Sequence, residues 1–364
     1  MAERAIEIAS FPMPDEDTYY FRLYYDALAK HGYKIVDTKG KSFGPAWLKE
    51  NSGRVRILHF HWPAYLYSDR NALVFLKKLL LFILNLRRAK SMGYKIAWTV
   101  HNLFPHERNN MALEYAGRLA ISWFSDVVFV HFLEAKGMVS RFFLRKKDVY
   151  MIPHGNFSAI FENKCGRDEA RKRLGIPPDA FVYILFGPVR PYKGIESAIQ
   201  AFKKMDDKGS VLIVAGNPKD KHLGDFVSDE ARSNTRIFPF LRFIEKNEVQ
   251  YFFNASDAVL LPYRQVFTSG NLFLALTFSR PVVAPDMGII SEVVDDSCGV
   301  KYSPDAANEN LLEAMRKIRT VDFAKASEAA CVKASAYSWE RSAEISRMAF
   351  GTLLGRVNCH EQKN

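Results

Sequence analysis

One stretch of the sequence decides the fold, residues 187–194, which read Gly187-Pro188-Val189-Arg190-Pro191-Tyr192-Lys193-Gly194. The apolar run Phe181 to Phe186 precedes it and predicts a buried strand, and apolar residues at helical spacing follow it over Ile195 to Met205. Arg190 and Lys193 therefore stand in a turn at the carboxyl end of a strand. A planar guanidinium and a compact ammonium both complement phosphate oxygens, so this turn predicts a phosphate site. In isolation, the same pair would be interpreted as solvated turn residues.

A second turn of this kind lies further along the chain. Ala258 to Leu261 is a short apolar strand candidate, and a helix is predicted to begin within Thr268-Ser269-Gly270-Asn271. Such a start exposes unpaired backbone N–H groups at the positive end of the helix dipole, where phosphates bind. The two hydroxyls add donors, and Gly270 permits close approach of the backbone. On neighbouring strands of a parallel sheet, the two turns predict one diphosphate pocket. Its residues are Gly187, Arg190, Lys193, Thr268, Ser269, Gly270 and Asn271.

Length and composition indicate a soluble globular protein with two α/β domains. The chain has 364 residues, of which 48% are hydrophobic and 25% charged. Cys165, Cys298, Cys331 and Cys359 are far apart and include no C-x-x-C pair, which predicts reduced thiols, neither a disulfide framework nor a metal site. The first residues lead directly into a strand without the pattern of a signal peptide, so we expect a cytoplasmic protein.

The net charge of +11 favours nucleic acid, an anionic membrane or a phosphorylated substrate as partner. No zinc-finger spacing, RNP-type aromatic pattern or basic recognition helix is present, which excludes nucleic acid. The segment Ala72 to Ala89 has an apolar centre between basic flanks and is too short to span a bilayer. It fits a core helix with basic ends, or a helix lying on an anionic membrane surface. Arg141 to Lys147 is a second basic and aromatic cluster.

Strand-like and helix-like segments alternate along both halves of the chain, which predicts parallel, doubly wound α/β sheets. The expected strands are 5–11, 33–37, 55–59, 95–100, 126–131, 149–152, 181–186, 211–215, 235–238, 258–261 and 281–284. We expect a first domain over 1–155, a linker over 156–178, a second domain over 179–336 and a C-terminal helix over 337–364 that packs back on the first domain. A ligand cleft is expected between the carboxyl ends of the two sheets.

These elements together resemble a GT-B glycosyltransferase of the nucleotide-sugar-dependent family 4 type. The matching segments are Gly187-x-x-Arg190-x-x-Lys193-Gly194, Ala215-Gly216-Asn217-Pro218, Asp257 to Pro262, Arg280 to Ala284 and Tyr337-Ser338-Trp339-Glu340. The resemblance implies two Rossmann-like domains with an interdomain cleft. It also implies that Arg190 and Lys193 bind the donor diphosphate.

One departure from family 4 concerns a pair of glutamates, whose positions hold Val266 and Leu274 here. The segment that carries them is similar to that of the bacterial exopolysaccharide, xanthan-type lipid-linked β-mannosyltransferases. Leu58 to Pro63 and His101 to Glu107 resemble that group's H-x-H-W-P and H-N-x-x-P-H-E stretches.

This resemblance implies transfer of a hexose from a nucleotide diphosphate sugar to a lipid-linked saccharide in exopolysaccharide or glycolipid synthesis. Mannose is favoured, glucose and glucuronate stay open, and so does the choice between GDP and UDP. We expect inversion of the anomeric centre, no metal, and no cofactor besides the donor substrate. Location on the inner face of the cell membrane follows from the acceptor.

An inverting enzyme needs a base within reach of the acceptor hydroxyl. Glu107 is the first candidate, with His101 beside it in the same predicted loop. The alternative carboxylates are Asp15, Glu16 and Asp17, the last of which also suits a helix N-cap. The residues expected to line the acceptor site are His61, Trp62, His106 and His154.

Two other functions fit the sequence. A nucleotide-sugar epimerase with the GT-B fold would use the same diphosphate site but would not need the basic, aromatic first half. A non-catalytic sugar-nucleotide-binding subunit of a polysaccharide complex would tolerate Val266 and Leu274.

Overall fold

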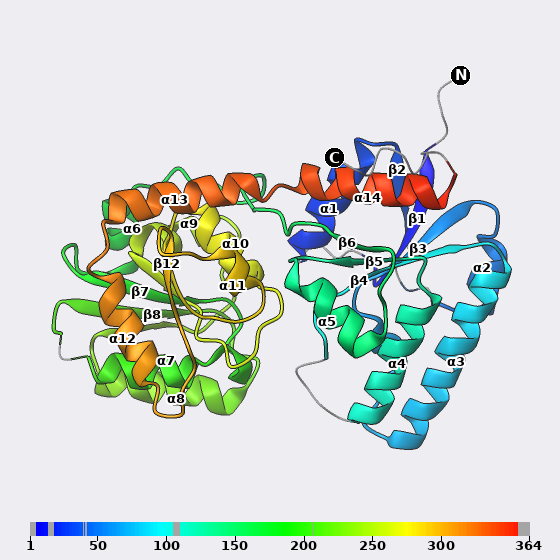
Figure 1. Cartoon of the computed structure of the whole chain (residues 1–364). Helices are drawn as coiled ribbons and strands as arrows, with labels where there is room; N and C mark the ends of the chain where they lie inside the picture. The colour runs from blue at the N-terminus through cyan, green and yellow to red at the C-terminus, as the bar shows by residue number, and fades with distance from the viewer. Residues whose placement is uncertain are drawn as a thin grey trace. The chain divides into compact units, whose positions relative to one another are not determined.

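The computed structural model describes residues 5–13, 18–38, 40, 42–104, 110–205 and 207–355. The chain folds as two compact units (Figure 1). Unit 1 consists of Met1–Gly155 and Ser338–Asn364, and unit 2 of Asn156–Tyr337. Each contains a six-stranded sheet whose neighbouring strands all run parallel, which confirms the predicted fold class. The cleft expected between the units stays a prediction.

The sheet of unit 1 has the order β2-β1-β3-β4-β5-β6. Its strands are β1 (Ile6–Phe11), β2 (Tyr33–Val36), β3 (Val55–Phe60), β4 (Lys95–Thr99), β5 (Val127–Val130) and β6 (Val149–Met151). All six coincide with predicted strands, with ends that differ by a residue or two. The apolar runs that predict them are almost wholly buried, as expected for a parallel sheet covered on both faces.

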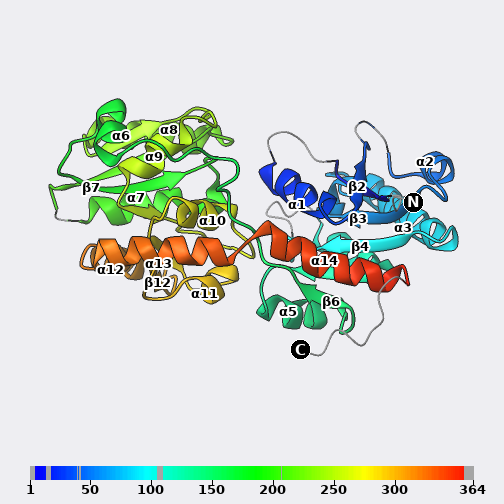
Figure 2. The same ribbon diagram turned by 90° about the horizontal axis from the view of Figure 1, so that it is seen from above.

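Helices cover both faces of this sheet. On one face, α1 (Tyr19–Ala29) lies beside α14 (Trp339–Leu353), as Figures 1 and 2 show. The Tyr24 hydroxyl donates to Ser346 Oγ at 2.8 Å and joins the two helices. The other face carries α3 (Ala72–Ser91), α4 (Met111–Phe124) and α5 (Glu134–Phe143) (Figure 1). The short helices α2 (Pro45–Glu50) and η1 (Pro63–Leu66) complete the unit.

Helix α3 is buried along one side only. Asn71 caps its start by accepting from the N–H groups of Leu73 and Val74. Phe75, Leu79 and Phe82 are on its buried side. Leu73, Leu80 and Leu84 on its other side are exposed, so α3 is not the fully buried core helix that was one of its two interpretations. No described helix is both long and apolar enough to cross a membrane.

The sheet of unit 2 has the order β12-β11-β10-β7-β8-β9. Its strands are β7 (Phe181–Phe186), β8 (Ser210–Ala215), β9 (Ile237–Phe240), β10 (Ala258–Leu260), β11 (Val282–Pro285) and β12 (Gly299–Tyr302). Five of them agree with the sequence prediction. The sixth, β12, was missed because it is short, begins with Gly299 and carries Lys301.

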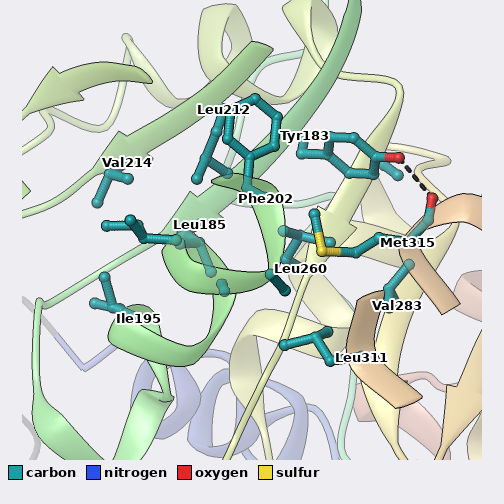
Figure 3. Packing of buried hydrophobic residues seen from close by; sticks show 14 of the residues in the cluster. Tyr183, Leu185, Ile195, Phe202, Leu212, Val214, Leu260, Val283, Leu311 and Met315 are labelled. Atoms are coloured by element: carbon teal, nitrogen blue, oxygen red, sulfur yellow. Dashed lines mark hydrogen bonds between the residues drawn. The ribbon is translucent and has the colours of Figure 1, made fainter. Parts of the chain in front are cut away.

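Two groups of helices cover this sheet. The group α7 (Ile195–Lys203), α8 (Lys221–Ser233) and α12 (Glu309–Ile318) covers one face, and α9 (Val249–Ala255), α10 (Gly270–Thr277) and α13 (Phe323–Ala336) cover the other (Figure 1). Between the first group and the strands lies a core in which Phe202 and Met315 meet Leu212 and Leu260 (Figure 3). The Tyr183 hydroxyl is satisfied within this core by the Met315 carbonyl at 2.6 Å.

The stretch 156–178, expected as a linker, contains helix α6 (Arg167–Leu174) and belongs to unit 2. Arg171 explains the difference, because its fully buried guanidinium donates to the carbonyls of Ala255 and Ala180 and to the Asp257 carboxylate. Charges that suggest a solvated linker in the sequence are therefore used here to join α6 to the sheet. At the C-terminus, α14 packs on α1 within unit 1.

Candidate functional site

The first site lies at the point in the unit 2 sheet where the strand order reverses. From β7 the chain moves outward through β8 and β9, returns to β10 on the other side of β7, and continues to β11 and β12. A doubly wound sheet opens a crevice at such a point, beyond the carboxyl ends of the two central strands. Gly187 follows β7 there, and Pro262-Tyr263 follow β10. Both predicted turns therefore meet at one edge of the sheet.

Two glycines let the first turn pass this close to its neighbours. Gly194 has φ +68°, and a Cβ atom on it would lie 1.8 Å from the Pro262 carbonyl oxygen. Gly187 has φ +90°, and a Cβ there would lie 2.8 Å from Lys193 Nζ and 3.2 Å from Asn271 Nδ2. Both conformations favour glycine, and the second leaves room for polar groups around the carboxyl end of β7.

Lys193 is the buried cation of the site. The residue is 8% exposed, and its Nζ donates to the Phe186 carbonyl oxygen at 3.0 Å. No carboxylate pairs with it within the described part of the chain. Burial, with a smaller contribution from the nearby Arg190 guanidinium, lowers the pKa of Lys193 from 10.5 to about 7. An anionic ligand would stabilise a buried ammonium that donates only to a neutral acceptor.

The start of α10 adds donors from the opposite side. Ser269 is the N-cap, and its Oγ accepts from the Leu272 N–H at 3.2 Å and lies 3.0 Å from the Tyr263 hydroxyl. Asn271 Nδ2 donates to the Phe186 carbonyl at 2.7 Å, so it shares that acceptor with Lys193. The predicted helix start is therefore the observed one, with Ser269 of the two candidate hydroxyls as its cap.

The remaining residues of the predicted diphosphate pocket lie at the edge of this site. Arg190 is exposed, and its guanidinium has no hydrogen-bonded or ion-paired partner among the described residues. Thr268 is half-buried, and Gly270 is exposed as the first residue of α10. A Cβ on Gly270 would lie 3.7 Å from Phe157, an ordinary contact, so the unliganded protein does not itself require glycine there.

A small cavity opens at this point. It is lined by Gly187, Lys193 and Asn271 among polar and backbone groups, and by Val189, Leu261 and Tyr263. The structure also describes the two positions at which family 4 enzymes carry glutamates. Leu274 is buried in α10, and Val266 is half-buried in the loop before it. The arrangement offers cations and N–H donors for a diphosphate, with no carboxylate at either position.

The second site is a cluster of histidines at the carboxyl edge of the unit 1 sheet. His61, His101, His131 and His154 follow the ends of β3, β4, β5 and β6 in turn, and each is at most 5% exposed. Tyr20 of α1 stands among them, with ring centroids 4.8 to 5.8 Å from all four. Because consecutive strands end at the same edge, residues far apart in sequence meet here.

Three of the predicted unit 1 residues are in direct contact. His61 Nδ1 lies 3.0 Å from His101 Nε2, and the half-buried Trp62 stacks on His101 at 4.2 Å between centroids. His154 contacts Tyr20 and Trp339, and its Nδ1 donates to the Gly155 carbonyl at 2.9 Å. The predicted His106, Glu107, Asp15, Glu16 and Asp17 lie outside the described residues.

Burial keeps these imidazoles neutral. It lowers the pKa of His154 to about 3 and that of His131 to about 4. The pKa values of His61 and His101 also fall well below 6.5, first from burial and then from the neighbouring histidines. Each ring therefore presents one N–H donor and one lone pair.

The sequence-based prediction missed His131, and Tyr20 was not among its candidate site residues. His131 Nδ1 donates to the Ile152 carbonyl at 3.1 Å, which leaves Nε2 as a buried lone pair without a partner in the described structure. The signal was available, since His131 directly follows a strand end, as His61 does.

The family comparison with known proteins matches one of the two units. The family model described as "Glycosyl transferases group 1" matches residues 180–320, which are most of unit 2 and include its whole candidate site. Most of unit 2 is therefore similar to the glycosyl transferases of group 1.

A curated relative matches a longer part of the chain. The GDP-mannose:glycolipid 4-beta-D-mannosyltransferase of Xanthomonas campestris pv. campestris is 29% identical over 236 residues, 64% of this chain and 62% of the relative. The match thus spans less than two thirds of the relative's length.

Solved structures extend the comparison to both units. Sucrose-phosphate synthase from Thermosynechococcus elongatus has a TM-score of 0.75 at 16% identity and covers 98% of this chain and 100% of its own. Anabaena HepE, solved with UDP and glucose, has a TM-score of 0.70 at 14% identity and covers 97% and 100%. These similarities establish the fold as GT-B.

Proposed function

We propose that this chain is an inverting, metal-independent glycosyltransferase that moves a hexose, with mannose favoured, from a nucleotide diphosphate sugar to a lipid-linked saccharide. The observation that carries the proposal is the convergence of Lys193, Arg190 and the start of α10 at the β7–β10 reversal. The named function of the Xanthomonas relative supports a GDP-mannose donor and a glycolipid acceptor.

The donor site can stabilise a departing diphosphate without a metal. Negative charge grows on the bridging oxygen as the sugar leaves, and Lys193 with the N–H groups of α10 supplies preorganised donors for it. The exposed guanidinium of Arg190, which has no partner among the residues that the structure describes, suits the outer phosphate. Because Val266 and Leu274 carry no carboxylate, this site offers no nucleophile at those positions, which supports direct displacement and inversion.

Direct displacement requires a base for the acceptor hydroxyl. The histidine cluster of unit 1 supplies neutral lone pairs, and His101 is our candidate among the described residues. Glu107 stays the other candidate. Trp62, stacked on His101, offers an aromatic face for a sugar ring.

We also propose that the chain associates with the inner face of the cell membrane through α3. Leu73, Leu76, Leu80 and Leu84 are 42 to 79% exposed and follow one stripe of the helix. Contiguous exposed apolar surface of this kind marks interaction sites. Within the described residues, Lys77, Arg87 and Arg88 on the same helix form no ion pair, so their charge is available to anionic headgroups. This surface would bring the enzyme to a lipid-linked acceptor.

Calorimetric titration with GDP and with UDP tests the donor site. We expect clear binding of one nucleotide by the wild type and none by Arg190→Ala, Lys193→Ala. The matched control is Arg316→Ala, Lys317→Ala, which removes the same charge from the exposed face of α12 and should bind normally. Absence of binding to the wild type would overturn the donor site and favour the non-catalytic subunit.

A turnover assay then tests the reaction. Release of nucleotide that depends on a lipid-linked saccharide, with the sugar recovered on the lipid, is the expected result. Conversion of the nucleotide sugar without any acceptor would replace the transferase by an epimerase.

A further inference from the structure

Helix α4 has the reverse of the polarity expected for a surface helix. Its charged residues are Glu114 and Arg118, and each is only 2% exposed. Five uncharged residues at helical spacing form the opposite side, which we call the α4 outer face: Ala112, Tyr115, Ala116, Leu119 and Trp123. A helix that faces water places its charges outward and its apolar residues inward. The α4 outer face therefore lacks the composition of a water-facing surface.

This outer face is open in the structure. Trp123 is 81% exposed, the largest exposed fraction among the large apolar residues that the structure describes. Helix α3 lies beside α4 on the same face of the sheet (Figure 1), and it also turns exposed leucines away from the sheet. Exposed apolar residues therefore extend over two neighbouring helices, and a surface of this kind marks an interaction site.

The inner side of α4 holds turns at the carboxyl edge of the unit 1 sheet. Arg118 Nη1 donates to the Asn102 carbonyl oxygen at 3.1 Å, and Asn102 directly follows the candidate base His101. The Glu114 carboxylate accepts from the hydroxyl of Ser68, which follows η1. Buried charges need such hydrogen bonds in place of water. These contacts fix α4 against the edge at which the histidine cluster lies.

Cations border the outer face on both sides of Trp123. Lys90 of α3 and Arg145, which follows α5, line one surface hollow together with Trp123. Four further cations close to these two in sequence are exposed and form no ion pair within the described residues: Arg87, Arg88, Lys146 and Lys147. Two copies of such a surface would repel each other, whereas an anionic bilayer would attract it.

We propose that the α4 outer face enters the boundary of an anionic lipid bilayer, with Trp123 and Tyr115 at the level of the headgroups. Tyrosine and tryptophan rings suit that level because each has an apolar body and one polar group. Leu119, between them, faces the acyl chains. This is a lipid contact on a different helix from α3, and it follows from a different observation, the burial of both α4 charges.

The consequence for catalysis rests on the proposed function. The helix that meets the lipid on its outer side holds the Asn102 turn on its inner side. A helix with its side chains is about 10–12 Å across, so this turn lies roughly one helix diameter from the lipid. A saccharide whose lipid tail stays in the bilayer is then presented to the edge that carries His101.

Quenching of tryptophan fluorescence by brominated phospholipid tests the contact. Bromine on the acyl chains quenches an indole that lies in the bilayer, and the other four tryptophans are buried or half-buried: Trp47, Trp62, Trp98 and Trp339. We expect quenching of the wild type by vesicles that contain anionic lipid. Trp123→Phe should lose the quenching and still float with the vesicles. Unquenched fluorescence of vesicle-bound wild type would overturn the proposal.

A charge substitution on exposed residues tests the same face by vesicle flotation. Ala112→Glu, Trp123→Glu should lower partitioning into anionic vesicles roughly tenfold or more. Phe243→Glu, Val332→Glu is the matched control, because it adds the same charges at exposed apolar residues of unit 2 and should partition like the wild type. Thermal unfolding checks that all variants are folded. Equal partitioning of the two double variants would contradict the proposal.

Two other outcomes are distinguishable. A wild-type dimer that Ala112→Glu, Trp123→Glu dissociates, without quenching by brominated lipid, would assign the face to a second copy and refute the lipid contact. Quenching of Trp123 without any glycosyl transfer would refute the proposed function and leave the lipid contact standing. Transfer to a lipid-linked saccharide without quenching would refute this inference alone.

Discussion

Lys193 and Asn271 donate to the same oxygen, the Phe186 carbonyl at the end of β7, at 3.0 and 2.7 Å. One residue comes from the turn after β7 and the other from the start of α10. This shared acceptor ties the two halves of the candidate donor site together before any ligand arrives. It also leaves the ammonium with a neutral partner, and burial then lowers the pKa of Lys193 to about 7.

Nucleotide affinity should therefore fall as pH rises above 7. In the unliganded protein Lys193 loses its proton above its lowered pKa, whereas a bound diphosphate favours the ammonium. Binding then takes up a proton, and the Kd should rise by up to about tenfold per pH unit from pH 7 to 9. Calorimetry in two buffers with different ionisation enthalpies measures the uptake.

The control for this pH dependence is Lys193→Met, which should bind weakly with no such slope. It should also unfold at a higher temperature than the wild type at pH 7. The reason is the sign of the shift: the folded pKa lies below the unfolded value of 10.5, so the unfolded chain binds more protons and stability rises between pH 7 and about 10. An affinity independent of pH in the wild type would mean that Lys193 does not meet the phosphates.

Gly187→Ala should abolish nucleotide binding at a modest loss of stability. The new Cβ would lie 2.8 Å from Lys193 Nζ and would force the ammonium away, and the positive φ adds about 1–3 kcal/mol of strain. Gly137→Ala in α5 is the control, because no atom lies within 4 Å of its Cβ position and its φ is not positive. That variant should gain up to about 1 kcal/mol from helix propensity. Thermal unfolding measures the stability of both variants, and calorimetric titration measures their nucleotide affinity.

Ser269→Ala should weaken the donor site through the helix start. It removes the cap of α10, for a loss of about 1 kcal/mol, and releases the Tyr263 hydroxyl. Ser338→Ala removes the equivalent cap of α14, where Ser338 accepts from the Arg341 N–H, and should lose similar stability with unchanged nucleotide affinity. Equal nucleotide affinities in the two variants would mean that the start of α10 does not contribute to phosphate binding.

Vesicle flotation tests the α3 surface. Leu80→Glu, Leu84→Glu should remove binding to vesicles that contain anionic lipid, because two charges would enter the apolar stripe. Phe243→Glu, Val332→Glu places the same charges at exposed apolar residues of unit 2 and should leave flotation unchanged. If both double variants float equally well, α3 is not the membrane surface.

The sequence predicted the fold where local signals and burial agree. Apolar runs such as Phe181 to Phe186 have one stable place, a strand covered on both faces, so their bounds were found almost without error. Helix α6 was missed because Arg171 looks solvated in sequence, while the folded unit surrounds it with acceptors. His131 follows a strand end as His61 does, but only the folded sheet buries it among the other histidines.

The sequence by itself determined the two α/β units, the residue types of the donor site, and the apolar residues at 266 and 274. Tertiary structure decided how those residues act. Strand order brings the ends of β7 and β10 together, and only this neighbourhood buries Lys193 and moves its pKa. In unit 1, the same geometry places strand ends side by side, so that histidines far apart in sequence come into contact in one buried cluster. Spacing along a chain specifies side-chain chemistry, whereas proton position and charge depend on burial and contacts that only the folded sheet creates.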